Sequence, residues 1–331
     1  MSILDQIFSQ ARVQPKHIVL AEGTDQRVIS ASAAAARAGI ARVTLLGDPA
    51  QIESELRRRE GGSQVRIINP ASSPDLQRYA DCHAELRAHK GISAGQALEE
   101  MQDSLGYAAM MVRNGDADGT IAGAVATTAD TIRAGLQIIG RAPGVSMVSS
   151  FFLMVPSGEA CPIPGPVIFA DCALVVEPGP EELADIALAS AASARPMLGR
   201  EPVIAMLSFS TSGSPGHRRA RLVDDAAKIA ARRQPGLKID GGLQFDAAID
   251  PDIRRRKVPD CRIDEPPNVF VFPNLDAANI GYKIAERIGG MTAIGPVLQG
   301  MARPANDLSR GCSAEDILNL IAITSVQASN S

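Results

Sequence analysis

Short apolar runs alternate with longer helical patterns along this 331-residue chain, and this alternation constrains its fold more than any other feature. Strands are predicted in the first half at 17–21, 42–46, 65–68 and 120–125. Helices are predicted between them, through residue 37, near 49–60 and within 72–114. Such alternation is typical of βαβ units, in which helices cover the faces of a mostly parallel sheet.

A second set of elements begins near residue 146. Strands are predicted at 147–155, 167–170, 203–209 and 269–272, and helices at 180–197, 219–233 and 276–288. The length suggests two domains, because domains usually contain about 100–200 residues. The irregular stretch 250–268 carries a basic run at 254–257, which we interpret as a solvated face.

Composition and charge argue against several classes of protein. The net charge of −4 and the aromatic content of 3%, with no Trp, do not favour a nucleic-acid partner. We expect no membrane association, because no stretch approaches the length of a membrane span and the N-terminus lacks a secretory pattern. Five scattered cysteines without a Cys-x-x-Cys pair indicate neither a disulfide framework nor a zinc site. The sequence therefore predicts a cytoplasmic protein without a metal.

The stretch 304–317 is rich in polar residues and leads directly into a helical pattern. Ser309 and Arg310 precede the predicted helix start, and Asp316 falls in its first turn. The first amides of a helix lack intrahelical partners and carry the positive end of the dipole, so they favour anions. We interpret this stretch as an anion site with Asp316 as a possible base.

The same residues permit a purely structural interpretation. Ser313 and Asp316 have the spacing of a capping box, in which the acid only satisfies backbone amides. The two roles are compatible, and capping alone does not require so many polar residues before the helix.

A second candidate site covers 119–133. Small residues lead to Thr127 and Thr128, and small side chains let a ligand approach the backbone closely. Arg133 falls near the start of the next helix, where the dipole disfavours a cation unless an anion lies nearby. A solvent-facing arginine is the alternative. A third stretch, 208–216, is rich in hydroxyls and could bind a phosphate, although an ordinary turn is the favoured interpretation.

The run 304–312, Pro-Ala-Asn-Asp-Leu-Ser-Arg-Gly-Cys, resembles the signature of the phosphate acetyltransferase (phosphotransacetylase) family. Further matching motifs occur in the same order at 118–119, 127–133, 205–211, 240–248, 279–283 and 294–300. The resemblance covers essentially the whole chain, and several independent motifs make it more specific than any single one.

The resemblance implies two α/β domains with mostly parallel sheets and an active cleft between them. It assigns 1–145 and 296–331 to the first domain, to which the last helix returns, and 146–295 to a second domain that forms a homodimer. The implied reaction transfers an acetyl group reversibly between acetyl phosphate and coenzyme A, with release or uptake of inorganic phosphate. Coenzyme A is then a substrate, and no cofactor is expected.

The resemblance also implies roles for individual residues. Asp316 acts as the general base, while Ser309 and Arg310 bind the phosphate and stabilise developing charge. Arg133 and Arg87 contact coenzyme A or the transferred phosphate. The remaining residues assigned to substrate binding are Thr127, Thr128, Thr131, Asn306 and Cys312. The setting of Cys312 before a helix lowers a thiol pKa, but no base is evident to activate it, so a ternary-complex mechanism is expected.

Four positions depart from the family pattern. Ala126 stands where many members have His, Gly242 where Glu is frequent, Asn274 where Asp is usual, and Ala278 where Gly is usual. Three alternatives to acetyl transfer remain open. They are a phosphate butyryltransferase, a non-catalytic acyl-CoA-sensing module, and a decarboxylating dehydrogenase, whose acidic metal cluster and nicotinamide signature the sequence lacks.

Overall fold

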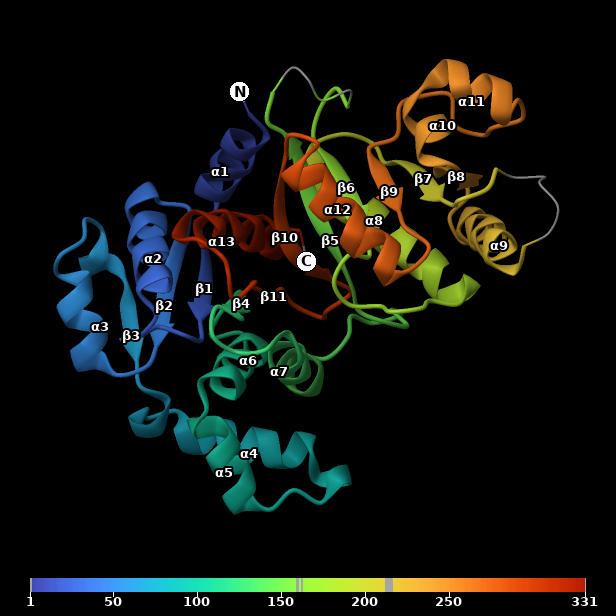
Figure 1. Cartoon of the computed structure of the whole chain (residues 1–331). Coiled ribbons are helices and arrows are strands. Elements are labelled where there is room, and N and C mark those ends of the chain that lie inside the picture. The colour runs from blue at the N-terminus through green and yellow to red at the C-terminus, as the bar shows by residue number, and fades with distance from the viewer. Residues whose placement is uncertain (1, 159–160, 162, 212–216, 331) are drawn as a thin grey trace. The chain divides into compact units, whose positions relative to one another are not determined.

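The computed structural model describes residues 2–158, 161, 163–211 and 217–330 (Figure 1). The chain forms two compact units, 1–143 with 301–331, and 144–300. The sequence placed the second boundary at 295/296, whereas residues 296–299 complete a strand of the second unit. The prediction of an α/β fold with mostly parallel sheets is confirmed.

Among the described residues of the first unit, five parallel strands form a sheet in the order β11-β4-β1-β2-β3. The strands are β1 (Lys16–Leu20), β2 (Ala41–Leu46), β3 (Arg66–Ile68), β4 (Gly119–Ala122) and β11 (Ala305–Asp307). The helices are α1 (Ile3–Val13), α2 (Gln26–Ala38), α3 (Pro49–Leu56), α4 (Leu76–Leu86), α5 (Ala94–Gln102), α6 (Ser104–Asn114), α7 (Thr128–Ala134) and α13 (Ala314–Ser329).

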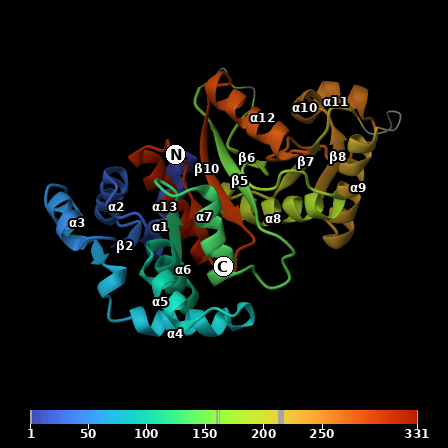
Figure 2. The same ribbon diagram turned by 60° about the horizontal axis from the view of Figure 1, so that its bottom comes forward.

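Local sequence explains how these helices are bounded and packed. The alanine-rich α2 begins where the Asp25 side chain accepts a hydrogen bond from the Arg27 amide, and ends at Gly39 with φ +67°. The last helix, α13, packs on α1, α2 and β1, so the end of the chain returns to the first sheet. Helices α4 and α5 pack on each other and form a helical lobe beyond α6 (Figures 1 and 2).

Six strands form the sheet of the second unit, within the described residues, in the order β10-β5-β6-β9-β7-β8. The strands are β5 (Ser149–Pro156), β6 (Val167–Ala170), β7 (Val203–Leu207), β8 (Lys238–Leu243), β9 (Val269–Val271) and β10 (Met291–Gln299). The helices are α8 (Pro180–Leu198), α9 (Arg218–Arg233), α10 (Phe245–Ile249), α11 (Pro251–Lys257) and α12 (Leu275–Arg287). Strand β5 runs antiparallel to both β6 and β10, and the other pairs are parallel.

Three strands were not predicted from the sequence. Strand β10 is interrupted by Gly295-Pro296, β8 contains Asp240-Gly241-Gly242, and β11 contains two polar residues, so none has a simple apolar pattern. Strand β11 therefore occupies the start of what the sequence indicated as a polar loop.

The interpretation of 254–257 as a solvated face is wrong for one residue. Arg254 is buried, and its guanidinium donates to the Ala248 carbonyl at 3.0 Å. Arg255 and Lys257 are exposed and pair with the neighbouring Asp252 and Asp246. No helix of the described residues is long and apolar enough to cross a bilayer.

Candidate active site

The residues that the sequence singled out gather mainly at one edge of the first sheet. Strands β1, β4 and β11 are parallel neighbours, with Leu20 opposite Ile121 and Asp307 opposite Ala122. Their carboxyl ends therefore meet, and the loops 21–25, 123–127 and 308–312 leave the sheet together. Ligands of open α/β sheets bind at this edge.

Ser309 and Arg310 lie exposed on the loop that follows β11. The Ser309 carbonyl accepts from the Cys312 amide at 2.9 Å, and its hydroxyl accepts from the Gly311 amide at 3.3 Å. The Arg310 guanidinium has no ion-pair or hydrogen-bond partner within the described part of the chain. An exposed cation with no competing carboxylate is available to an anionic ligand.

Asp316 combines the two roles that the sequence left open. Its Oδ2 accepts from the amide and the hydroxyl of Ser313, both at 2.8 Å, which completes a capping box at the start of α13. Its Oδ1 receives no hydrogen bond from any described residue. The carboxylate is exposed, so it can cap the helix and still offer one oxygen to a ligand.

Asn306 and Cys312 are less available to a ligand than the sequence indicated. The Asn306 amide is buried and donates to Thr324 Oγ1 at 2.9 Å and Gln327 Oε1 at 2.7 Å, both on α13. Both of its donors therefore hold β11 against α13. Cys312 is 7% exposed, and burial raises the pKa of its thiol, in contrast to the lowering expected before a helix. The positive charge of Arg27 only partly opposes this rise.

Thr127 and Arg133 are joined through Asp130. Thr127 caps α7, and its hydroxyl donates to Asp130 Oδ2 at 2.7 Å. The hydrogen bond from Thr127 lowers the pKa of Asp130 most, and the contact with Arg133 lowers it further. Arg133 Nη1 lies 2.6 Å from Asp130 Oδ1, but its side chain is 59% exposed. Exposed pairs of this kind contribute about 0–1 kcal/mol, so Arg133 can turn to a ligand at little cost.

Thr128 and Thr131 lie beside Asp307, a residue that the sequence analysis did not select. Thr128 Oγ1 donates to Asp307 Oδ2 at 2.7 Å, which links the start of α7 to β11. Burial raises the pKa of Asp307 to about 6, although the hydrogen bond from Thr128 opposes the rise. Asp307 Oδ1 and Thr131 Oγ1 are buried without a hydrogen-bond partner among the described residues. A Cβ at position 123 would collide with Asp307 Oδ1, which explains the glycine there.

Glu22 is a second residue that the sequence analysis missed. Its carboxylate accepts hydrogen bonds from the amides of Ala124, Val125 and Ala126, at 2.7, 2.9 and 2.6 Å. The backbone that follows β4 is therefore fixed before any ligand binds. Glu22 directly follows a predicted parallel strand, and the residues that follow such strands meet at one edge of the sheet. This position could have identified Glu22 as a site residue from the sequence.

Arg87 lies apart from these loops. It ends α4 in the helical lobe and is half-buried, and no hydrogen bond or ion pair of the described chain joins it to the residues above. The structure thus collects nine of the ten predicted site residues around β4, β11 and their following helices, and leaves Arg87 in the lobe.

The hydroxyl-rich stretch 208–216 belongs to the second unit. Ser208 Oγ accepts from the Ser210 amide at 3.3 Å, which is turn geometry, and residues 212–216 lie outside the described part of the chain. Asn274 caps α12 by accepting from the Ala277 amide at 2.9 Å, so Asn fulfils the capping role that an Asp could have.

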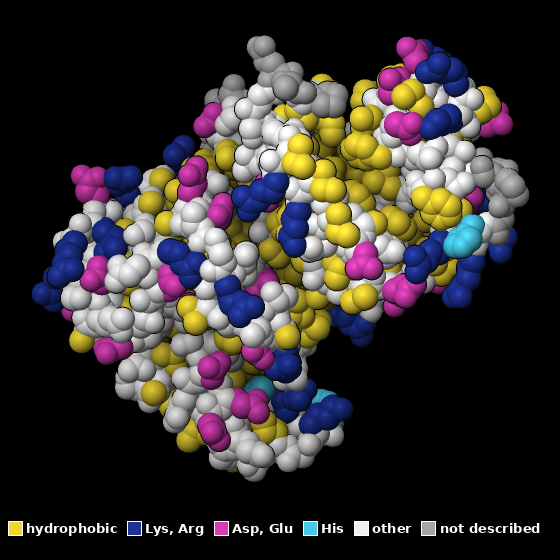
Figure 3. Space-filling model, in the orientation of Figure 1, with side chains coloured by type: hydrophobic (Ala, Val, Ile, Leu, Met, Phe, Trp, Pro, Cys, Tyr) yellow, Lys and Arg dark blue, Asp and Glu magenta, His cyan; other side chains and the backbone are white. Residues whose placement is uncertain are grey.

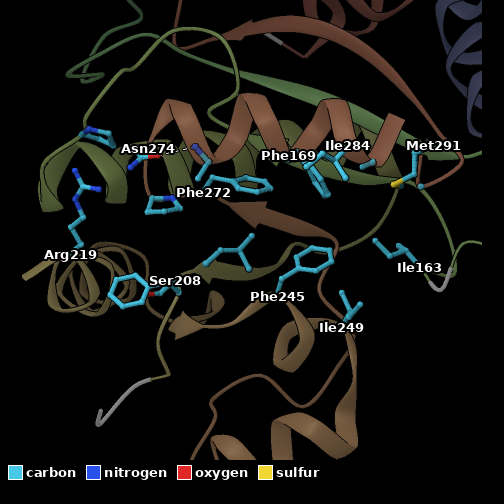
Figure 4. Close-up of a pocket in the computed structure, with 18 of the residues that line it drawn as sticks. Ile163, Phe169, Ser208, Arg219, Phe245, Ile249, Phe272, Asn274, Ile284 and Met291 are labelled. Carbon is cyan, nitrogen blue, oxygen red and sulfur yellow. Dashed lines mark hydrogen bonds between the residues drawn. The ribbon is translucent and has the colours of Figure 1, made fainter. Parts of the chain in front are cut away.

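An apolar groove of about 660 Å³ lies in the second unit between α12, α10 and the ends of β7 and β9 (Figure 4). Its walls include Phe169, Phe245, Phe272, Ile249, Ile284 and Met291. Hydrophobic side chains also gather on the surface over the second unit (Figure 3). Ile284 of α12 and Ile288 at its end are 54% and 82% exposed. Among the described residues, no group of His, Cys, Asp and Glu is arranged to hold a metal ion.

Comparisons with known proteins identify the family of the chain. A family model described as phosphate acetyl/butaryl transferase matches residues 2–325. The phosphate acetyltransferase of Paracoccus denitrificans is 52% identical over 327 residues, which cover 99% of both chains. The phosphate acetyltransferase of Acetivibrio thermocellus is 44% identical over 99% of this chain and 98% of its own. A crystal structure of a phosphotransacetylase from Streptococcus pyogenes superimposes with a TM-score of 0.93 at 39% identity, covering 99% and 98% of the two chains.

The chain belongs to the phosphate acetyl/butaryl transferase family, a family of acyltransferases.

Proposed function

We propose that the protein catalyses reversible transfer of an acetyl group between acetyl phosphate and coenzyme A. The observation that carries the proposal is the exposed group of Ser309, Arg310 and Asp316, placed on one short segment at the carboxyl edge of the first sheet. The names of the relatives support the choice of substrates. Acetyl phosphate, coenzyme A, acetyl-CoA and inorganic phosphate are then the ligands, and no separate cofactor is required.

The proposed step begins with the thiol of coenzyme A. Asp316 accepts the thiol proton while the sulfur forms a C–S bond to the acetyl carbonyl carbon. Collapse of the tetrahedral intermediate breaks the C–O bond to phosphate, and the proton finally leaves with that phosphate. Arg310 and Ser309 stabilise negative charge on the carbonyl oxygen and on the departing phosphate.

The proton transfer is the difficult part of this route. A typical carboxylate is a weaker base than a typical thiolate by roughly 6 kcal/mol. Full deprotonation before attack is therefore costly, and we infer that proton transfer accompanies C–S bond formation. A guanidinium beside the sulfur, such as that of Arg310, favours the thiolate and so lowers the free-energy cost of moving the proton from the thiol to Asp316.

Binding of coenzyme A is assigned to residues around this centre. Arg133 can exchange its exposed pair with Asp130 for a phosphate, because both partners are solvated. Arg87 lies on the helical lobe and would contact a more distant phosphate of the same ligand. Thr127 and Thr128 lie at the start of α7 beside the acyl site, Thr128 holds Asp307 by a hydrogen bond, and Thr131, whose Oγ1 is buried, lies one turn further along the helix. Asn306 is assigned to holding β11, and Cys312 lines the site without attacking the substrate.

A direct assay tests the proposal. Purified protein is mixed with acetyl phosphate and coenzyme A, without added metal or nucleotide, and thioester formation is followed. We expect turnover with both substrates present and none with either alone. Butyryl phosphate in place of acetyl phosphate tests the alternative butyryl transfer. Binding of acetyl-CoA without any turnover would instead support an acyl-CoA-sensing module.

We also propose that the protein is a homodimer formed through the second unit. The apolar groove supports this, because the exposed Ile284 lines it and the exposed Ile288 follows on the same segment, and contiguous exposed apolar side chains often mark an interaction surface. In a two-fold dimer the same surface is used by both copies, so α12 of one copy would cover the groove of the other. Sedimentation or light scattering at working concentration measures the mass directly.

A further inference from the structure

Arg27 has a contact pattern that no other arginine of the described chain shows. Its Nε donates to Asp25 Oδ1 at 3.0 Å, and Nη2 donates to Asp25 Oδ2 and the Ala124 carbonyl, both at 2.8 Å. Its Nη1 donates to the carbonyls of Arg310 at 2.8 Å and Cys312 at 3.0 Å. Every N–H of the guanidinium is therefore used.

These acceptors belong to the three loops that leave β1, β4 and β11. Asp25 follows β1, Ala124 follows β4, and the two carbonyls flank Gly311 in the loop after β11. The planar fork of a guanidinium can hold several acceptors in fixed directions, which the ammonium of lysine cannot do. One side chain thus fixes the relative positions of the loops that carry Ser309, Arg310 and Thr127.

We propose that Arg27 is a positioning residue for the acyl-transfer site, which acts by clamping the 309–312 loop to the ends of β1 and β4 rather than by binding a substrate. A donor that is already engaged cannot reach a phosphate without losing a bond to a carbonyl. Arg133 and Arg310 differ in this respect, because Arg133 has an exposed pair with Asp130 and Arg310 has no partner among the described residues. The kinetic test of this clamp depends on the proposed acyl-transfer activity. The structural test does not depend on it.

The kinetic test compares Arg27→Lys and Arg27→Ala. A displacement of about 1 Å in reacting groups can lower turnover about 100-fold. We expect both variants to lose turnover by about 30- to 100-fold, with Michaelis constants for acetyl phosphate and coenzyme A changed less than about threefold. Millimolar methylguanidinium added to Arg27→Ala should restore part of the turnover.

The matched control is Arg37→Ala on the same helix. Arg37 pairs with Glu60, and both side chains are well exposed, at 60% and 81%. This control should keep the activity of the unmodified protein. If Arg27→Lys instead raised a Michaelis constant and kept turnover, Arg27 would be a substrate ligand and the clamp would be refuted.

The structural test follows alkylation of Cys312, whose Sγ lies 3.9 Å from Arg27 Nη1. Lysine keeps a positive charge beside the thiol, so a faster reaction in Arg27→Lys reports a looser loop. We expect about tenfold faster iodoacetamide labelling of Cys312, read by peptide mass spectrometry, because labelling of a buried group depends on local opening. The fully buried Cys172 of the second unit serves as an internal reference.

Asp25→Ser provides a second variant in case Arg27 substitutions unfold the protein. Serine retains the cap of α2 but cannot hold two nitrogens of the guanidinium. We expect the same change in Cys312 labelling, to a smaller extent. Unchanged Cys312 labelling in folded Arg27→Lys and Asp25→Ser would overturn the clamp, whatever the assay shows. An inactive unmodified protein with faster Cys312 labelling in the variants would overturn the acyl-transfer proposal alone.

Discussion

The carboxyl edge of the first sheet presents charged side chains, whereas the groove of the second unit is lined mainly by apolar side chains. At the sheet edge, Arg310 and Asp316 are exposed, while Glu22 and Arg27 hold the surrounding backbone in place. In the groove, four aromatic rings and several aliphatic side chains face one another with few polar groups between them. The first surface is suited to charged ligands and the second to apolar contact.

The two surfaces differ because binding a phosphate and associating with another protein require different side chains. A site for phosphates requires cations that are already oriented, because hydrogen bonds to a ligand are strongest when no rearrangement is needed. An association surface requires apolar area and shape instead. We therefore expect substitutions at the sheet edge to alter kinetics without altering mass, and substitutions in the groove to alter mass first.

The largest effect is expected for Ile284→Asp in the groove. A dimer would bury this position in both copies, so the change removes two apolar contacts and desolvates two carboxylates. The dissociation constant should rise by about 1,000-fold or more, which leaves monomers at micromolar concentration. Sedimentation velocity measures the mass. Val13→Asp, at an exposed position of α1, is the control and should not change it. An unchanged mass for Ile284→Asp would show that the groove does not form the dimer interface.

Arg310→Lys should lower turnover by about 100-fold or more. A guanidinium can grip a phosphate through two parallel bonds, whereas an ammonium is a point charge. Initial rates at saturating substrates measure the effect, and Arg57→Lys, in an exposed pair with Glu53, is the matched control. Near-normal turnover would remove Arg310 from the chemistry.

Asp307→Asn tests the buried carboxyl beneath the site. The pKa of Asp307 in the folded protein, about 6, lies above its ordinary value of 3.8. Its favourable contribution to folding is therefore full below about pH 4 and is lost as the pH rises through 6. Relative to the unmodified protein, the variant should gain about 1–2 kcal/mol in unfolding free energy between pH 4 and pH 7.

Urea unfolding at the two pH values measures this gain, with Asp81→Asn on the exposed face of α4 as the control. A constant difference between Asp307→Asn and the unmodified protein would show that Asp307 does not titrate in this range.

Arg133→Ala should raise the Michaelis constant for coenzyme A by about tenfold and lower turnover less. Arg133 is exposed and its ion pair with Asp130 is solvated, so its expected role is to bind coenzyme A. Complete progress curves at several coenzyme A concentrations separate the two constants. A fall in turnover alone would assign Arg133 to the chemical step.

The smallest effect is expected for Cys312→Ala, which should keep turnover within about twofold, whereas Asp316→Asn should lose most of it. Burial raises the pKa of the Cys312 thiol, which makes it a poor nucleophile near neutral pH. Initial-rate patterns with both substrates varied should intersect. Parallel lines, or an acetylated Cys312 isolated after incubation with acetyl phosphate alone, would point to a covalent intermediate.

Sequence patterns predicted the regular part of the fold well. The strands β1, β2, β3 and β9 and the helices α8, α9 and α12 begin and end close to their predicted bounds, because apolar periodicity and capping residues are local signals. The polar loop before α13 and the Ser313–Asp316 cap were also readable from spacing alone. Short or interrupted strands such as β11 and β10 were not.

The sequence by itself determined which residues begin α13 and α7, because capping depends on residues three positions apart. Only the tertiary structure decided that Asn306 turns to α13, that Cys312 is buried, and that Asp307 holds its proton more tightly. These outcomes depend on neighbours more than a dozen residues away, such as Thr128 for Asp307. The same holds for Glu22 and Arg27, which act on loops about 100 to 285 residues further along the chain. Burial and charge partners of this kind arise when parallel strands bring distant loops to one edge, and no local pattern encodes that meeting.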